Sequence, residues 1–288
     1  MSSITKIILK QTILGIFYLF YLPSLTCIAL WARFFSSLSN PRLVWGSVPI
    51  INNKYWSASM KKIGVKSTTF VSNFYENINT ENDWDKILTS SFYFTPSLFK
   101  PYFAFAYGLL KFDIFFITCD GFFIGNSYLW RIQHYFFTLA DKKVVVMPYG
   151  GDALVYKNIR ALGTTHAMNI SYPEASRQQR FISNKLDYWV EKADVFIPGI
   201  MGPEAMGRWD VLTPSHLFID LDEWMSSTKI NHSNGKDKEL VIVHAPNHRG
   251  VKGTEFIINA VNNLKRKGYK LELKLLEGLQ NKEVKEIL

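Results

Sequence analysis

Short apolar runs alternate with segments of helical spacing through most of the chain. The apolar runs have the length of strands and lie at residues 42–45, 67–71, 113–118, 143–147 and 194–198. Apolar residues recur at helical spacing in the segments 53–64, 126–140 and 175–193, whereas residues 76–90 are polar and predict a loop with a short helix. Nearly uninterrupted apolar strands between helices are typical of parallel strands covered on both faces. We therefore predict an α/β fold, a Rossmann-like doubly wound parallel sheet over residues 40–225, with ligands at the carboxyl ends of its strands.

A second unit of the same kind follows a polar linker at residues 226–238. Residues 240–244 predict a buried strand, a helix begins near Thr254, and residues 270–276 predict the next strand. Such a β-α-β unit normally makes parallel strands with a right-handed crossover. We expect a partial second Rossmann-like domain over residues 239–288. Its helix is amphipathic, with five apolar residues on one face: Phe256, Ile257, Ala260, Val261 and Leu264.

The loop between this strand and this helix carries two cations, Arg249 and Lys252. Free N–H groups and the helix dipole favour negative charge at a helix N-terminus, so the loop suits a phosphate. A solvated basic loop is the alternative, and the spacing alone does not choose between the two.

Residues 240–278, LVIVHAPNHRGVKGTEFIINAVNNLKRKGYKLELKLLEG, resemble the start of the C-terminal domain of GT-B glycosyltransferases of the GT4 type. The resemblance implies that Arg249 and Lys252 bind the diphosphate of a nucleotide-sugar donor and that Gly253 permits close backbone approach. It implies sugar transfer to an acceptor with no cofactor and no obligatory metal. The chain ends at Leu288, before the place of the acidic motif that holds the donor sugar in this family. We therefore expect this chain, truncated within the C-terminal domain, to transfer little or no sugar alone.

The N-terminal segment is the most apolar part of the chain. Residues 11–32 contain no charged residue and are long enough to cross a bilayer. Cations lie on both sides of the segment, so they do not set an orientation. Pro23 predicts a kink, which also suits a helix lying partly in one leaflet. We predict a membrane-associated helix within residues 1–36; a signal peptide and a buried helix of the globular domain are the alternatives.

Charge and cysteine content narrow the partners and the compartment. The formal net charge of +9 indicates an anionic partner, which the nucleotide sugar and membrane lipids both supply. Nucleic acid is disfavoured because the cations are scattered and no recognition motif occurs. Two cysteines, Cys27 and Cys119, predict neither a disulfide framework nor a zinc site, which favours a reducing compartment. We expect the body at the cytoplasmic face of the cell membrane, with a membrane-proximal glycan or lipid-linked acceptor in assembly of a surface polysaccharide or glycolipid.

Candidate acceptor-side residues follow two of the predicted strands. Gly150 and Gly151 form a turn that ends in Asp152, and this turn either lines the cleft or is simply a tight turn in which Asp152 caps the following helix. GT4-like enzymes have a similar turn, and the resemblance implies that Asp152 contacts the acceptor hydroxyl or serves as its general base. Asp120, also after a strand, is the second candidate for catalysis, and His166 is the third.

A metal site has little support in the sequence. Asp220 and Asp222 form an Asp-x-Asp pair of the kind that binds Mn²⁺ or Mg²⁺ elsewhere, but three residues are a weak signal, and we predict no metal. The dinucleotide fingerprint and the phosphate loop do not occur, which disfavours NAD enzymes and P-loop NTPases.

Two further alternatives stay open. The aromatic-rich segment 92–107 predicts either a contact with lipid or a buried wall against the sheet. Two functions other than catalysis are the alternatives to an enzyme. The first is a non-catalytic remnant or binding subunit, and the second is an adaptor at a membrane surface.

Overall fold

The larger of two sheets contains six parallel strands. The computed structural model describes residues 3–76, 79–199, 206–213, 218–222, 224, 235–246, 248–250, 252–279 and 281–287. The strands follow the order β3-β2-β1-β4-β5-β6. This is the order of a doubly wound sheet, so the predicted Rossmann-like α/β class is confirmed. The strands are β1 Leu43–Ser47, β2 Ser67–Val71, β3 Lys86–Ile87, β4 Ile114–Ile117, β5 Lys143–Val146 and β6 Val195–Phe196.

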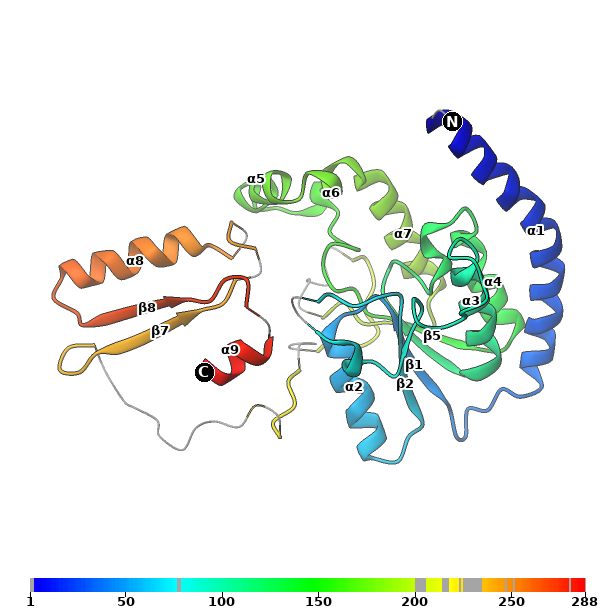
Figure 1. The fold of residues 1–288 in the computed structure, drawn as a ribbon, viewed down its shortest axis with the longest axis horizontal. Coiled ribbons are helices and arrows are strands. Elements are labelled where there is room, and N and C mark those ends of the chain that lie inside the picture. The colour runs from blue at the N-terminus through cyan, green and yellow to red at the C-terminus, as the bar shows by residue number, and fades with distance from the viewer. Residues whose placement is uncertain are drawn as a thin grey trace.

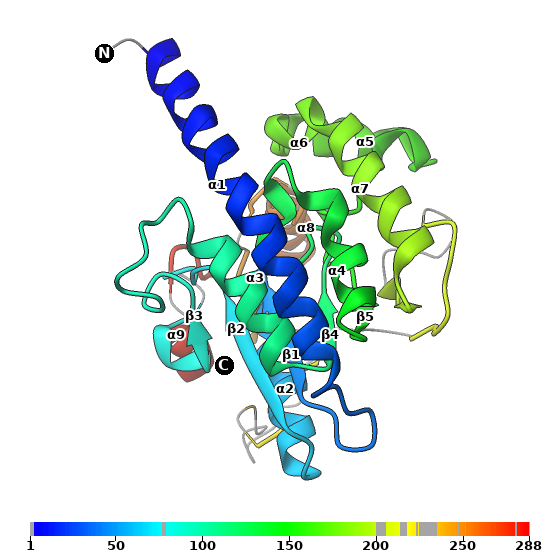
Figure 2. The same cartoon turned by 90° about the vertical axis from the view of Figure 1, so that its right-hand side faces the viewer.

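Helices cover both faces of this sheet. Helix α2, Ile51–Lys62, packs on β1 and β2. The opposite face carries α3, Lys100–Lys111, together with α4, Gln133–Leu139, and α7, Gln179–Lys192 (Figures 1 and 2). Two shorter helices lead away from the sheet before α7. The remaining helical segments are η1 Glu81–Asp83, η2 Ile124–Asn126, η3 Trp130–Ile132, η4 Tyr156–Asn158, α5 Leu162–Ser171 and α6 Pro173–Arg177.

A buried ion network joins the amino ends of three strands. Both Asp113 and Lys142 have fully buried side chains, and their Oδ1 and Nζ atoms lie 3.1 Å apart. The other oxygen of Asp113 accepts hydrogen bonds from Arg42, from the backbone N–H at 2.9 Å and from Nε at 2.8 Å. Burial by itself would raise the pKa of Asp113, but the hydrogen bonds from Arg42 and Lys142 lower it to about 2. The carboxylate therefore stays charged and holds β1, β4 and β5 together at their foot.

Helix α1, Ser3–Arg33, forms a third layer across α3 and α4 (Figure 2). Its inner side belongs to the core, because Leu25 and Ala29 are fully buried. Its outer side is apolar as well, and Leu19 and Phe20 are each 72% exposed. Helix α1 is long and apolar enough to cross a membrane. A core helix of a soluble protein or a signal sequence meets the same criteria of length and composition. The helix is continuous past Pro23, where a kink is predicted, and α1 curves along its length (Figure 1). Residues 3–33 thus form an apolar helix that is partly a core element, and its association with a membrane stays a prediction.

The second unit has the predicted β-α-β form. Strands β7, Leu240–His244, and β8, Leu271–Leu275, are parallel, and α8, Thr254–Arg266, connects them. A last helix, α9, spans Asn281–Ile287. The apolar face of α8 is only partly covered: Val261 is buried, but Phe256 is 80% exposed. A sheet of two strands covers only part of a helix of this length.

Several predicted boundaries are wrong. The helix expected over 126–140 is two 3₁₀ turns followed by α4, because the chain wraps around the buried Gln133 side chain. Gln133 accepts from the Phe122 N–H and donates to the Trp130 carbonyl. The helix expected over 175–193 is interrupted at Gln178. The N–H of Gln178 donates to the carbonyls of both Glu174 and Ala175, and the 3₁₀-type bond to Ala175 ends α6.

The sequence pattern did not predict one strand and one helix of the first domain, β3 and α3. The segment 76–90 holds the edge strand β3 in addition to its short helix, and residues 100–111 form α3. The inner face of α3 is the buried wall that the aromatic segment predicted, whereas Tyr93 and Phe94 in the preceding loop are exposed. Residues 226–234 of the predicted linker lie outside the described residues.

Candidate functional site

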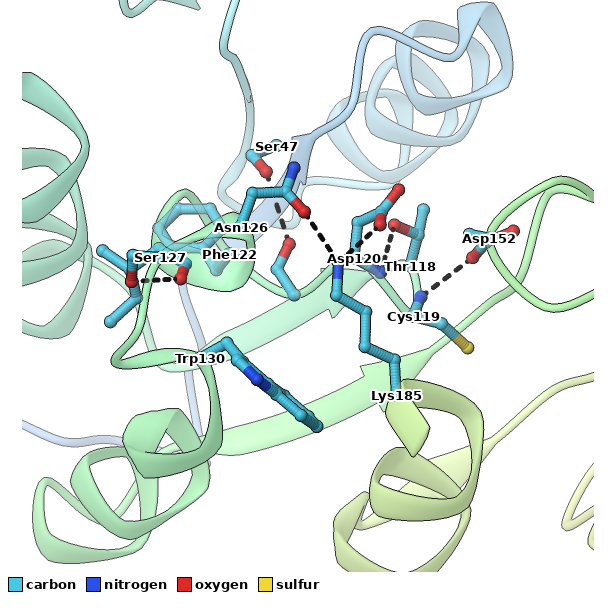
Figure 3. A network of polar contacts seen from close by, with 12 residues as sticks. Ser47, Thr118, Cys119, Asp120, Phe122, Asn126, Ser127, Trp130, Asp152 and Lys185 are labelled. Atoms are coloured by element: carbon cyan, nitrogen blue, oxygen red, sulfur yellow. Dashed lines mark hydrogen bonds and ion pairs between the residues drawn. The ribbon is translucent and has the colours of Figure 1, made fainter. Parts of the chain in front are cut away.

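A cavity of about 270 Å³ lies at the carboxyl edge of the large sheet. Strands β4 and β5 end beside each other there, and the segments that follow them carry Asp120 and the turn from Tyr149 to Asp152. Helix α7 contributes Lys185 from the adjacent layer (Figure 3). Asp120, Tyr149, Gly151, Asp152 and Lys185 all line the cavity. This is the edge at which doubly wound sheets bind ligands.

The carboxylate of Asp120 is held in place and still partly open. Its Oδ1 accepts a hydrogen bond from Lys185 Nζ at 2.9 Å, and its Oδ2 lies 3.4 Å from the Tyr149 hydroxyl. The side chain of Asp120 is 27% exposed, whereas that of Lys185 is 4% exposed. Lys185 also donates to Asn126 Oδ1 at 2.8 Å (Figure 3). The ammonium group of Lys185 thus fixes the Asp120 carboxylate at the cavity wall, where a carboxylate oxygen can accept a proton from a bound hydroxyl group.

The segment that carries Asp120 has little freedom to move. A Cβ atom at Gly125 would lie 1.5 Å from the carbonyl oxygen of Asp120, so only glycine fits at this position. Ser47, at the end of β1, donates to the Gly121 carbonyl at 3.3 Å and accepts from the Phe123 N–H at 3.2 Å. Together with the buried Gln133 amide, these contacts fix the position of the Asp120 backbone.

Asp152 holds its own turn together. Its Oδ1 accepts from the N–H groups of Tyr149 and Gly150, each at 3.0 Å, and its Oδ2 accepts from the Cys119 N–H at 2.9 Å. The side chain thus connects the segment after β5 to the segment after β4. The expectation that Asp152 caps a following helix is wrong, because its hydrogen bonds go to these loop N–H groups. Gly150 has φ 142°, a backbone conformation that suits glycine, and Gly151 lines the cavity.

Burial and charge set the protonation of the groups around Asp152. Burial and the nearby Asp120 carboxylate raise the pKa of Asp152 to about 7, against the three N–H donors that lower it. Burial, with the two carboxylates, also raises the pKa of Tyr149 and of the Cys119 thiol. Tyr149 is therefore a hydroxyl donor at neutral pH. Cys119 is a buried free thiol whose raised pKa disfavours the thiolate form, and Cys27 is free as well.

The other predicted site residues lie elsewhere. His166 is exposed on α5 and is not among the residues that line this cavity. Arg249, Lys252 and Gly253 lie together before α8, and Gly253 is its left-handed N-cap, with φ 66°. Arg249 forms ion pairs with Glu255 at 2.6 Å and with Glu277 at 2.9 Å.

The Asp-x-Asp pair meets a lysine. Lys62 Nζ lies 2.7 Å from Asp222 and 3.4 Å from Asp220. Over the described ranges, the structure contains no group of three or more His, Cys, Asp or Glu that could hold a metal.

Sequence reasoning missed Lys185, Asn126 and Tyr149. A signal for Lys185 was present, because it falls in the apolar stripe of α7 with Ile182, Leu186 and Trp189, all of them buried. A lysine at a core position of an amphipathic helix indicates a buried charge that needs a partner. Asn126 and Tyr149 carry no comparable pattern.

Comparison with known proteins adds no relative. No family model, curated protein or solved structure matches the chain. The fold and site by themselves define the class: a Rossmann-like α/β protein with an ion-paired carboxylate in a cavity at the carboxyl edge of its parallel sheet.

Proposed function

We propose that this protein is a glycosyltransferase that moves a sugar from a nucleotide diphosphate sugar to a membrane-proximal glycan or lipid-linked acceptor. The observation that carries the proposal is the Asp120–Lys185 pair in the cavity at the sheet edge. A fixed and partly exposed carboxylate suits a general base that takes the proton of an acceptor hydroxyl. The acceptor oxygen forms a bond to the sugar carbon while the bond from that carbon to the diphosphate breaks.

Asp120 is the better base of the two predicted carboxylates. Asp152 accepts hydrogen bonds from three backbone N–H groups and its side chain is buried, so we assign it the role of positioning the two loops. Asp120 has a partly exposed side chain that lines the cavity, and its Oδ2 has the Tyr149 hydroxyl at 3.4 Å. We therefore assign the proton transfer to Asp120 and the support of the cavity wall to Asp152 and Gly151.

The loop before α8 supplies the donor side of the proposal. Arg249 and Lys252 would offset the negative charge that grows on the departing diphosphate, and fixed cations do this without an obligatory metal. Glu255 and Glu277 now hold the guanidinium of Arg249, so a diphosphate would have to displace or share these carboxylates. His248, in the same loop, packs edge-on against Tyr172 of the first domain with ring centroids 5.1 Å apart.

Replacing Arg249 or Lys252 by Ala should weaken binding of UDP or GDP by roughly tenfold each, because a charge-assisted hydrogen bond to phosphate is lost. Calorimetric titration of the full chain measures this. Lys265→Ala, on the same unit in the last turn of α8, is the matched control and should bind as the parent does. Nucleotide affinity that ignores both loop substitutions would remove the donor-site assignment.

We further propose that the outer side of α1 anchors the protein in a membrane. Leu19→Lys combined with Phe20→Lys should move most of the protein from the membrane to the soluble fraction, since each lysine at membrane depth costs about 3 kcal/mol. Fractionation of cells followed by immunoblotting measures the change. Leu162→Lys with Phe256→Lys adds the same charge at exposed apolar positions away from α1 and should leave membrane recovery unchanged.

A further inference from the structure

A second and much larger hollow lies between α1 and the body of the domain. Its volume is about 1170 Å³, and we call it the α1 groove. Leu14 and Tyr18 line it from α1, and Leu98 and Tyr102 line it from the segment around the start of α3. The far wall includes Tyr128, whose hydroxyl accepts a hydrogen bond from Gln11 of α1 at 3.3 Å. The groove is therefore mostly apolar, and the Gln11–Tyr128 hydrogen bond connects its two walls.

Two cations stand in this apolar groove. Lys10 and Arg131 both line it, and the Arg131 guanidinium lies 4.4 Å from the centre of the Trp130 ring. Within the described part of the chain, neither side chain has a carboxylate within 4.0 Å. Other cations of this protein do have such partners, as Lys61 has in Asp85 and Arg249 has in Glu277. An apolar channel with two uncompensated cations suits an amphiphile whose polar end is anionic.

The α1 groove adjoins the Asp120 cavity. Asn126 and Phe181 line both hollows. Asn126 also accepts a hydrogen bond from Lys185, the lysine that holds Asp120 (Figure 3). A molecule that lies in the groove and passes Asn126 would therefore bring its end to the carboxylate. The groove lies on the inner side of α1, and the opposite side of the same helix turn exposes Ile13 and Ile16.

We propose that the α1 groove binds the lipid-phosphate part of the acceptor. The hydrocarbon chain lies against Leu14, Tyr18 and Leu98, the phosphate lies between Lys10 and Arg131, and the acceptor hydroxyl extends past Asn126 to Asp120. This assignment rests on the proposed glycosyl transfer and makes its acceptor a phosphate-bearing lipid. Such a ligand uses all three features of the groove, namely its apolar lining, its two cations and the wall at Asn126 and Phe181 that it shares with the cavity.

Photolabelling of the full chain in phosphatidylcholine nanodiscs tests the proposal. The probe is a long-chain alkyl phosphate with a diazirine in the chain, and its neutral counterpart is the same chain ending in a hydroxyl group. We expect the phosphate probe to label peptides that contain Leu14, Tyr18 or Leu98. Lys10→Gln combined with Arg131→Gln should reduce this labelling about tenfold, and Ser97→Trp, which fills the groove without changing charge, should reduce it as strongly.

The matched control removes two positive charges from the last turns of α1 and α3, at the ends of these helices that do not line the groove. Arg33→Gln with Lys111→Gln should label as the parent does. Equal labelling by the phosphate and the alcohol, confined to outward residues such as Phe20, would overturn the proposal, because it would report only contact with the bilayer. Competition by inorganic phosphate as strong as that by unlabelled alkyl phosphate would overturn the lipid assignment.

Nucleotide titration in the same nanodiscs separates this inference from the proposed function. If UDP or GDP binds and the groove variants label normally, the groove assignment alone fails. If groove labelling behaves as expected and no nucleotide binds, the donor site fails and the lipid site stands.

Discussion

Replacing Asp120 by Asn should lower glycosyl transfer by at least about 100-fold, because the amide keeps the shape of the side chain but cannot accept the proton of the acceptor hydroxyl. Transfer is measured from a radiolabelled nucleotide sugar in membranes of cells in which the variant replaces the native gene. The affinity for UDP or GDP should stay within about twofold, since Asp120 acts on the acceptor and not on the nucleotide.

The loss must be separated from the effect of leaving Lys185 without its partner. Lys185 is almost fully buried, so Asp120→Asn also strands a cation. The double variant Asp120→Asn, Lys185→Met removes both charges together. If the defect came only from the stranded cation, the double variant would regain activity. If Asp120 is the base, the double variant should unfold at the parent's temperature and stay inactive.

Replacing Asp113 by Asn should reduce the free energy of unfolding by roughly 3–5 kcal/mol, because it leaves the buried Lys142 ammonium without its carboxylate. Urea unfolding followed by tryptophan fluorescence measures the change. Asp194→Asn is the matched control at the foot of β6, where the partner Lys143 is 44% exposed; we expect a loss of about 1 kcal/mol or less. Equal losses in the two variants would contradict the buried network.

The same carboxylate predicts a dependence on pH. The folded state lowers the pKa of Asp113 to about 2, below the value of roughly 3.9 expected in the unfolded chain. The stabilisation from its charge is therefore complete above about pH 4 and is lost as the pH falls towards 2. In Asp113→Asn that loss should be absent, so the stabilities of parent and variant should converge between these two pH values.

The central strands could be predicted because each one is a self-contained apolar run. The bounds of β2 and β7 coincide with the predicted strands, and the predictions for β4 and β5 extend beyond the observed strands by no more than a residue at either end. The edge strand β3 has two residues, one of them a lysine, so no local pattern distinguishes it from a loop. The breaks before α4 and at Gln178 depend on single tertiary hydrogen bonds, and periodicity carries no information about those.

The site was predictable only as far as the sheet edge fixes it. Asp120 and Asp152 follow strands β4 and β5, and because the strands are parallel, the two side chains were expected at the same edge. Their different roles depend on which N–H groups or cations meet each carboxylate. Lys185 comes from a helix 65 residues away from Asp120, and no spacing rule connects the two.

The proposed anchoring by α1, together with its place in the core, decides how this protein can be handled in the laboratory. Many membrane-bound enzymes become soluble when a separable anchor is cut away. Here the same helix carries the core residues Leu25 and Ala29. Removing the helix would therefore expose the apolar surfaces of α3 and α4 to solvent. A soluble form is better obtained by changing only the outward residues, such as Leu19 and Phe20, to polar ones. Solubilisation of this chain is therefore a problem of surface redesign and not of truncation.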